Sequence, residues 1–295
     1  MIVTPTNLAD INVAYDLMFQ QGVGSVAPSW PRIAMTAPSS GTSTKLPWLK
    51  NIPGLRRWIG DRQFHSLAAG GYEFPKVEYE DSVSVPLRDI EADQYGVYAT
   101  YMRLMGEGYA AFPDEKIWGA LAAGFDTNGH DGVPLFSASH PVIGADGKNK
   151  TVSNLQTGSG SAWYLMVSNR GVKPLIWSVR KEEGFKPLLP PELIDREKRM
   201  DYGCYVDAGV GYGFWQLIFA SKATLDATNY AAARAAIMNF YGDHGRKLGL
   251  VPDLVVCSAA DEGAARKVVK NSLASGGGTN EWAGTADVLV SPWLT

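Results

Sequence analysis

The sequence predicts a fold of the α+β class, and three stretches of the chain carry this prediction. A strand with alternating side chains at 76–85 leads directly into a long helix over 88–121. Apolar, strand-like pieces then follow one another between 163 and 219. The last part, 223–295, mixes helical and strand patterns and predicts a small α/β module.

The chain opens with an amphipathic helix, predicted over residues 6–20. The apolar side chains that share one face are Leu8, Ile11, Tyr15, Met18 and Phe19. Gly22 and Gly24 are expected to end the helix, because glycine is a poor helix former. Two prolines then predict an extended segment over 27–35.

Residues 37–75 are predicted to form an extended loop. The stretch 38–72 begins with a turn-rich run and shows no clean helical or strand period. So irregular a segment cannot bury Trp48 and Trp58 by itself, so the loop needs another surface to lie against. The stretch 38–72 holds five basic residues against one acid, a net charge of +4. The basic residues are Lys45, Lys50, Arg56, Arg57 and Arg62.

The strand predicted over 76–85 is half-buried, because apolar and polar side chains alternate along it. Its apolar face would carry Val77, Tyr79, Val83 and Val85. Asp81 is the exception on this face. In the helix over 88–121, Pro113 is expected to introduce a kink or a break. Residues 73–93 hold seven acids against two bases, a net charge of −5, and the acids at the helix start complement its positive end.

The middle and the end of the chain predict shorter elements. Residues 124–160 are rich in Gly, Asp and Ser and predict a loop. The charged stretch 181–199 contains a Pro-Pro pair and predicts an exposed excursion. Strands are predicted at 163–167, 174–179, 210–219, 254–257 and 286–290. Helices are predicted at 228–240 and after Ser258.

Composition favours an assembly subunit over a protein that reads nucleic acid. Hydrophobic residues make up 45% of the 295 residues, charged residues only 19%, and there are nine tryptophans. Such a balance is typical of buried protein–protein interface, although a compact enzyme with a large core could share it. The net charge of −3 offers no basic footprint for reading DNA, which does not exclude a container for DNA.

Cysteine usage and hydropathy predict a soluble protein that is made in a cytoplasm. Cys204 and Cys257 form no CxxC pair and are predicted to be buried small apolar side chains rather than a disulfide. The N-terminus lacks the pattern of a signal peptide, and no apolar run approaches the ~18 residues that a membrane helix needs. We expect no membrane partner.

No motif predicts catalysis, a cofactor or a metal. The glycine-rich run 209–213 lacks phosphate-loop spacing and predicts a strand start. The loop 126–132 resembles a cation loop, but Ser137 stands where an EF-hand needs its last acidic ligand, so a surface turn is predicted. The histidines are scattered, and His140 lies near Ser137 and Ser139 only in sequence.

Eight short stretches, each weak alone, occur in a fixed order along the chain and together resemble one known family. They are residues 1–5; Trp48-Leu49 with 55–60; Asp131-Gly132 with Phe136 and His140-Pro141; 162–165; 173–176; 211–217; 245–248 with 254–256; and Trp293-Leu294. The family is the Mu-like prophage major head subunit, gpT, and the resemblance covers essentially the whole chain.

This resemblance implies a Hong Kong 97-type capsid fold, which has an N-terminal arm, an extended loop, a peripheral domain with a spine helix, and an axial domain. The corresponding residues here would be 1–36 for the arm, 37–75 for the extended loop, 76–222 for the peripheral domain with its spine helix at about 88–121, and 223–295 for an axial-type module. In many such capsids the chain returns to the peripheral domain after the axial one, whereas the strands between 163 and 220 precede the module here.

The resemblance further implies the major capsid protein of a tailed bacteriophage, which catalyses nothing. It would assemble with itself as hexameric and pentameric capsomers into an icosahedral head that encloses dsDNA and contacts it non-specifically. Expected partners are a scaffold protein, because no N-terminal scaffolding segment is evident, a portal at one vertex, and a decoration protein. The expected location is the virion, after assembly in the host bacterial cytoplasm. The alternative is a soluble α/β enzyme or ligand-binding protein whose site the sequence hides.

The charge pattern predicts which residues meet between subunits. In a shell of identical subunits, a loop that reaches a neighbour meets the acidic strand and helix start that its own chain also carries. Exposed ion pairs contribute only ~0–1 kcal/mol each, but many copies make weak contacts decisive. The alternative is that both charge runs are solvated faces. The predicted contact residues are Trp48, Arg56, Arg57, Trp58, Arg62, Glu78, Glu80, Asp89 and Glu91.

Overall fold

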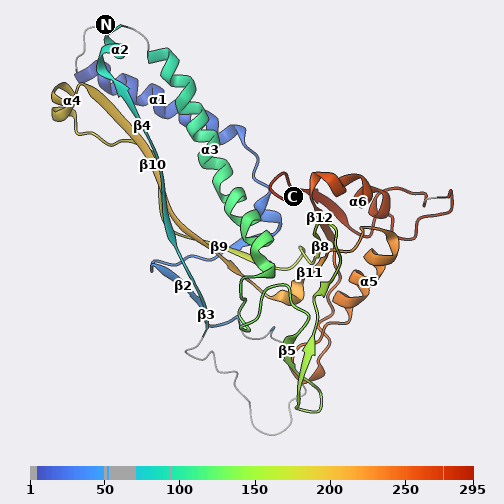
Figure 1. Ribbon diagram of the computed structural model, residues 1–295. Coiled ribbons are helices and arrows are strands. Elements are labelled where there is room, and N and C mark those ends of the chain that lie inside the picture. The colour runs from blue at the N-terminus through green and yellow to red at the C-terminus, as the bar shows by residue number, and fades with distance from the viewer. Residues whose placement is uncertain (1–4, 50–51, 53–70, 93–94, 275) are drawn as a thin grey trace.

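Two lobes of different construction make up the protein (Figure 1): an elongated lobe built on a four-stranded sheet and a second lobe built on a five-stranded sheet. The computed structural model describes residues 5–49, 52, 71–92, 95–274 and 276–295.

The α-helices are α1 (Pro5–Ser25), α2 (Leu87–Glu91), α3 (Tyr95–Ala122), α4 (Pro191–Glu197), α5 (Ala227–Met238) and α6 (Glu262–Val269). The strands are β1 (Ala34–Thr36), β2 (Ser43–Leu46), β3 (Tyr72–Pro75), β4 (Val77–Pro86), β5 (His140–Ile143), β6 (Asn149–Val152), β7 (Leu155–Gln156), β8 (Trp163–Met166), β9 (Leu175–Pro187), β10 (Arg199–Tyr212), β11 (Ile218–Ser221), β12 (Leu254–Cys257) and β13 (Asp287–Val290). Short 3-10 helices lie at Trp30–Arg32, Ala123–Phe125, Trp215–Leu217, Asp243–Gly245 and Ala259–Asp261.

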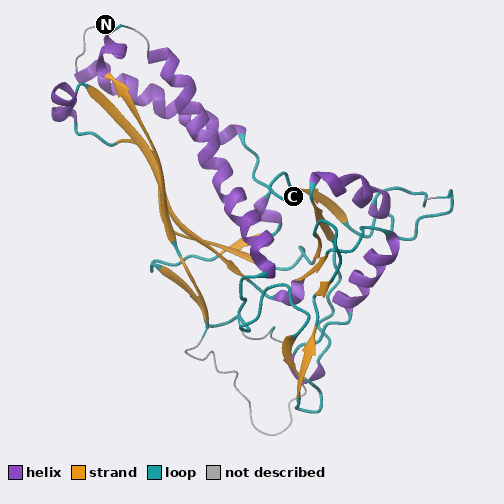
Figure 2. Ribbon diagram, in the orientation of Figure 1, coloured by secondary structure: helices purple, strands orange, loops and turns teal. Residues whose placement is uncertain are grey.

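The elongated lobe is a twisted sheet covered on one face by α1 and α3 (Figure 2). Its strand order is β1-β9-β10-β4, with β10 antiparallel to both β9 and β4 and β1 parallel to β9. Alternate residues of β10, from Met200 to Ala208, are buried beneath the helices. Tyr15 of α1 meets Tyr202 edge to face at 5.3 Å between ring centroids. The other face of the sheet is therefore left for polar residues.

The helices α1 and α3 touch backbone to backbone at two glycines. A Cβ atom on Gly22 would lie 2.0 Å from the carbonyl oxygen of Arg103, and one on Gly106 would lie 2.1 Å from the carbonyl oxygen of Phe19. These separations are far below any van der Waals contact, so only residues without a Cβ permit this approach. The close pair seats Phe19 against Tyr109 and Phe185, and so fixes α1 on the sheet.

The second lobe is a five-stranded sheet in the order β13-β12-β8-β11-β7. β12 runs parallel to β13 and antiparallel to β8, and every residue of β8, β11 and β12 is buried. Asp226 caps the start of α5, where its side chain accepts a hydrogen bond from the Asn229 N–H. The helices and strands predicted within 223–295 are present, but their sheet also takes β7, β8 and β11 from earlier in the chain.

Buried apolar side chains form one large core and two small clusters. The large core fills the second lobe and the base of the elongated lobe, and α3 enters it with Ile117, Trp118 and Leu121. The small clusters lie between the helices and the sheet farther along the elongated lobe, where α3 contributes Met102 and Met105. Among the described residues, no helix has both the length and the apolarity needed to cross a membrane.

Two predicted boundaries in the first third of the chain are wrong. α1 continues through Gly22 and Gly24 to Ser25, because Gly22 serves the contact with α3 rather than a helix end. Pro113 lies inside α3, so the predicted division of the helix at this residue is wrong, and the alternative of a kink stays a prediction. The interruption falls earlier, between α2 and α3, so Asp89 and Glu91 belong to the short helix α2 and not to the first turn of the long one.

Three predicted irregular stretches contain regular structure. Residues 124–160 hold the β5–β6 hairpin and β7. The predicted excursion 181–199 is instead the end of β9, the helix α4 and the start of β10. β2 and β3 pair at the two ends of the predicted 37–75 loop. The glycine run 209–213 falls at the end of a strand, not at a start.

Candidate assembly surface

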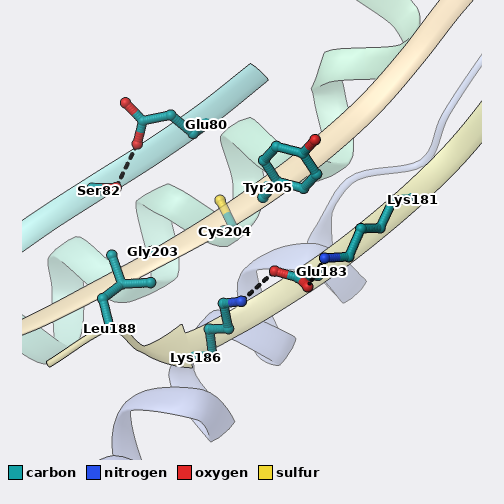
Figure 3. A pocket seen from close by; sticks show the side chains of 9 residues that line it. All are labelled: Glu80, Ser82, Lys181, Glu183, Lys186, Leu188, Gly203, Cys204 and Tyr205. Atoms are coloured by element: carbon teal, nitrogen blue, oxygen red, sulfur yellow. Dashed lines mark hydrogen bonds and ion pairs between the residues drawn. The ribbon is translucent and has the colours of Figure 1, made fainter. Parts of the chain in front are cut away.

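The face of the elongated lobe opposite α1 and α3 carries polar and charged side chains from three strands. Strand register places Glu80 beside Tyr205, and Tyr205 beside Glu183. These strands enclose a hollow of about 300 Å³, here called the charged hollow (Figure 3). Its lining residues are Glu80, Ser82, Lys181, Glu183, Lys186, Leu188, Gly203, Cys204 and Tyr205.

Opposite charges line the two sides of the charged hollow. On β9, Glu183 lies between two lysines, 2.6 Å from the Lys181 ammonium and hydrogen-bonded to Lys186 (Figure 3). These three residues carry a net positive charge. On β4, the Glu80 carboxylate accepts a hydrogen bond from Ser82 and remains exposed. The hollow is therefore acidic along the sheet edge and basic toward β9.

The ion pairs of Glu183 with Lys181 and Lys186 should be detectable as a shift in the titration of the Glu183 carboxyl group. Hydrogen bonds from Lys181 and then Lys186 lower the pKa of Glu183 to about 2. A carboxyl group whose pKa is lower in the folded chain than in the unfolded chain stabilises the fold at pH values above the unfolded pKa. This stabilisation is lost as the pH falls towards the folded pKa. We expect the Glu183 carboxyl carbon to titrate near pH 2 by NMR, and Lys181→Gln to move the midpoint upward. Lys198→Gln, at the residue after α4, should not move it. A midpoint at the ordinary glutamate value in the parent chain would contradict the pairing.

One of the predicted contact residues, Glu78, is paired with an arginine that lies at a β-bulge of the same subunit. Val179 pairs with Ala208 and Lys181 with Asp207, so Arg180 is the extra residue on β9. Its guanidinium donates to the buried Asp207 carboxylate and lies 3.3 Å from Glu78. The bond to Asp207 raises the pKa of Arg180. Glu78 is therefore already paired with an arginine of its own subunit.

The predicted contact residues occupy different parts of the chain. Trp48 is half-buried and packs against the large core of its own subunit, with its ring 6.1 Å from that of Phe214. Part of the surface on which the loop lies therefore belongs to its own chain, and the contact of Trp48 with another subunit stays a prediction. The remaining loop residues, Arg56, Arg57, Trp58 and Arg62, lie outside the described residues.

The predicted acids follow the edge of the elongated lobe rather than forming one cluster. Glu78 and Glu80 lie on the polar face of β4. Asp89 lies on α2, where it accepts a hydrogen bond from the Tyr98 hydroxyl at 2.5 Å and pairs with Arg88 at 3.5 Å. Glu91 is the exposed last residue of α2. The basic members of the surface, Arg180 and the lysines around Glu183, were not predicted, because two bulges hide the alternation of β9.

His140 is the centre of a buried polar network. Its Nδ1 lies 2.6 Å from the Asp131 carboxylate and its Nε2 lies 3.0 Å from the Asn154 side-chain oxygen. The ring stacks on Trp215 at 4.1 Å between centroids. Asp131 thus pairs with a histidine. Across the described part of the chain, no group of three His, Cys, Asp or Glu side chains could hold a metal ion.

Comparison with known proteins gives one family over nearly the whole chain. The Mu-like prophage major head subunit gpT family matches residues 8–294. The major capsid protein of Escherichia phage Mu is 32% identical over 313 aligned positions that cover 100% of both chains. The Mu-like prophage FluMu major head subunit of Haemophilus influenzae is also 32% identical, and the match covers 92% of this chain and 91% of that one.

Solved capsid structures share the fold. A chain of the bacteriophage JBD30 procapsid is similar with a TM-score of 0.83 and 32% identity, covering 99% of this chain and 100% of its own. A chain of the JBD30 capsid gives a TM-score of 0.79 at 24% identity, with 100% of both chains covered. The predicted α+β fold of the Hong Kong 97 capsid type is confirmed. The chain therefore belongs to the Mu-like prophage major head subunit gpT family, and it is the major head protein of a tailed phage and a component of the virion.

Proposed function

We propose that the subunit assembles as hexamers and pentamers into an icosahedral head that encloses dsDNA. The observation that carries this proposal is the similarity of 99% of the chain to a subunit of the JBD30 procapsid, at a TM-score of 0.83. The paired charges of the polar sheet face support contact between copies, because acidic and basic side chains line opposite sides of one surface. The role is structural, and we propose that the subunit catalyses nothing.

This proposal implies an assignment of residue ranges to the parts of the capsid fold. We assign residues 1–36 to the N-terminal arm, 37–75 to the extended loop and 76–222, apart from three strands named below, to the peripheral domain with α3 as its spine. The axial-type domain then includes 223–295. Because β7, β8 and β11 share the sheet of β12 and β13, we extend the axial-type domain to these strands as well.

The proposed partners follow the capsids to which the chain is similar. One solved JBD30 capsid is decorated with minor capsid protein trimers, and its subunit has a TM-score of 0.75 with this chain at 25% identity. We propose that a decoration protein binds this head too, that a scaffold protein guides its assembly in the host bacterial cytoplasm, and that a portal occupies one vertex. DNA inside the head would be contacted without sequence preference, in keeping with a net charge of −3.

Assembly of the purified chain tests the proposal directly. We expect large shells or capsomers in sizing columns and negative-stain images, because the surfaces that join copies belong to this chain. A protein that remains a small oligomer, with or without a scaffold protein, would overturn the capsid role.

The basic residues of the loop should be needed for assembly but not for folding. We propose that Arg56, Arg57 or Arg62 of one subunit contacts Glu80, Asp89 or Glu91 of another, with Glu78 shared with Arg180. Arg56→Glu combined with Arg57→Glu should abolish shells in negative-stain images and leave the circular dichroism spectrum unchanged.

The matched control keeps the charge by changing both arginines to lysine, and it should still assemble. High ionic strength should weaken assembly of the parent chain, because dissolved salt screens exposed charge pairs. The screening length is ~8 Å at physiological ionic strength and becomes shorter as salt is added. Normal shells from the glutamate variant would show that the charges are only solvated.

A further inference from the structure

The first residue of β5, His140, is completely buried, and both of its ring nitrogens face a polar side chain. Its ring lies between Asp131, in the loop that follows the spine helix, and Asn154, the residue before β7. One face of the ring stacks on Trp215, at 4.1 Å between centroids and 9° between ring planes. Since no solvent reaches the ring, the two polar partners determine which of its nitrogens carry hydrogen.

The orientation of the Asn154 amide is fixed by its other contacts. Its side-chain nitrogen lies 2.8 Å from the carbonyl oxygen of Leu135 and 3.3 Å from that of Ile218. Its side-chain oxygen lies 2.9 Å from the backbone nitrogen of Ser137. Exchanging the two atoms would place acceptor against acceptor and donor against donor. The atom 3.0 Å from His140 Nε2 is therefore an oxygen, and Nε2 must carry a hydrogen and donate it.

The other ring nitrogen faces a carboxyl group. His140 Nδ1 lies 2.6 Å from Asp131 Oδ2, a short distance that is typical of a hydrogen bond between charged groups. The second carboxyl oxygen of Asp131 accepts from the Val133 N–H at 3.5 Å. An ionised carboxylate can only accept, so Nδ1 must donate as well. With a hydrogen on both nitrogens, the ring is an imidazolium cation and Asp131 is its anion.

The surroundings favour this charged form of the pair. A free carboxyl group loses its proton before a free imidazolium does, so the shared proton belongs to the ring. The electron-rich face of the Trp215 indole stacks on the ring and stabilises a cation. The side chains are 0% exposed for His140 and 10% exposed for Asp131, so water competes little for either charge. Each charge is therefore stabilised mainly by the other.

The histidine next to Asp131 in the sequence takes the opposite state. His130 is largely buried, and its Nε2 has no hydrogen-bond partner among the described residues. Burial lowers the pKa of His130, the charge of Asp131 opposes this shift, and the charge of His140 adds to it. The net shift is downward, so His130 is neutral at pH values where the pair is charged. Asp131 thus has one cationic partner, His140.

We propose that His140 and Asp131 form a buried ion pair whose bound proton holds the loop after the spine helix on β5, and that alkaline pH releases this loop. Loss of the proton from Nδ1 would leave two acceptors 2.6 Å apart, which repel each other. The folded chain would therefore hold one proton more than the unfolded chain, whose histidines are neutral above pH ~7.5. Stability falls as the pH rises wherever the folded state binds more protons. The device belongs to the single subunit and does not depend on assembly.

Nitrogen NMR of the full chain, with labelled histidine, tests the protonation state. At about pH 8, both ring nitrogens of His140 should carry a hydrogen, and the signal should vanish in His140→Gln. The same chain unfolded in urea provides the reference, because its histidines are neutral at this pH. A folded His140 with hydrogen on Nε2 alone would overturn the proposal.

Asp131→Asn removes the need for the proton and preserves the shape of the network. The new amide can accept from the Val133 N–H and donate to Nδ1 of a neutral His140. Between about pH 7.5 and 8.5, the folding equilibrium constant of the parent chain should fall about tenfold per pH unit relative to that of the variant, the effect of one proton. Urea unfolding at each pH measures both constants, and parallel curves would contradict the ion pair.

Asp146→Asn is the matched control, because it makes the same change at an exposed ion pair of the β5–β6 hairpin. Asp146 pairs with Lys150 at 3.5 Å, and carboxylates and ammonium groups keep their charge over this pH range. This variant should therefore keep the slope of the parent chain. The thiols, His130 and the exposed His244, which lies in the 3-10 helix packed on β5, are the same in all three chains, so their titration cancels. If Asp131→Asn fails to fold, the NMR signal of the parent chain decides alone.

Discussion

Gly106→Ala should destabilise the subunit by about 3 kcal/mol, the upper end of what overpacking a tight contact costs. The added methyl group would lie 2.1 Å from the Phe19 carbonyl oxygen, which is backbone and cannot rotate away. α1 would have to move outward and withdraw Phe19 from Tyr109 and Phe185. Urea unfolding followed by circular dichroism measures the change in the free energy of unfolding.

Gly108→Ala provides the control two residues along the same helix. Its methyl group would meet nothing within 4 Å, so the higher helix propensity of alanine should stabilise the subunit by up to about 1 kcal/mol. The two substitutions are chemically identical and should have opposite signs. Equal effects at both positions would contradict the backbone contact between α1 and α3.

Asn154→Ala should be comparably damaging in the second lobe. The buried amide donates to the carbonyl oxygens of Leu135 at 2.8 Å and Ile218 at 3.3 Å. Its side-chain oxygen accepts from the Ser137 N–H at 2.9 Å and lies 3.0 Å from His140 Nε2. Each buried group left without a partner costs ~1–3 kcal/mol, so we expect a loss of about 4 kcal/mol in all.

Thermal unfolding of the same protein measures this loss. Asn149→Ala, at an exposed position of β6, is the matched control and should change stability by less than about 0.5 kcal/mol. A small effect of Asn154→Ala would mean that water replaces the amide, and that the network around His140 does not hold the loop before β5.

Regular alternation and strong apolar runs made parts of the fold predictable. The strand at 77–86, the buried strands β8 and β12 and the helix α5 all have one clear period or a continuous apolar run. β9 was predicted to end early, because bulges near Arg180 and Gly184 shift its alternation and leave a run of charges that resembles a loop. Periodicity cannot detect a strand whose register slips twice.

Contacts between distant residues account for most of the remaining errors. A glycine within a helix can end it or allow a close approach, and only the position of α3 shows that Gly22 does the latter. The contact of Glu78 with Arg180, 102 residues away in the chain, was likewise not predicted, and the contact of Glu78 with another subunit stays a prediction. The type of capsid fold came from the family resemblance, whereas the individual elements came from the residues.

Pro113 removes a backbone hydrogen bond from the spine helix between the two regions where the helix is packed in apolar clusters. Proline has no N–H, so the carbonyl group of Tyr109 lacks its partner within the helix. On one side of this point α3 is fixed in the large core, and on the other it is fixed among the small clusters of the elongated lobe. The arm from Pro113 to the start of α3 is roughly 27 Å long at ~1.5 Å per residue. A bend of about 5° at this point would move the far end by roughly 2 Å. A small change of angle at the base of the helix would therefore become a larger displacement at its tip.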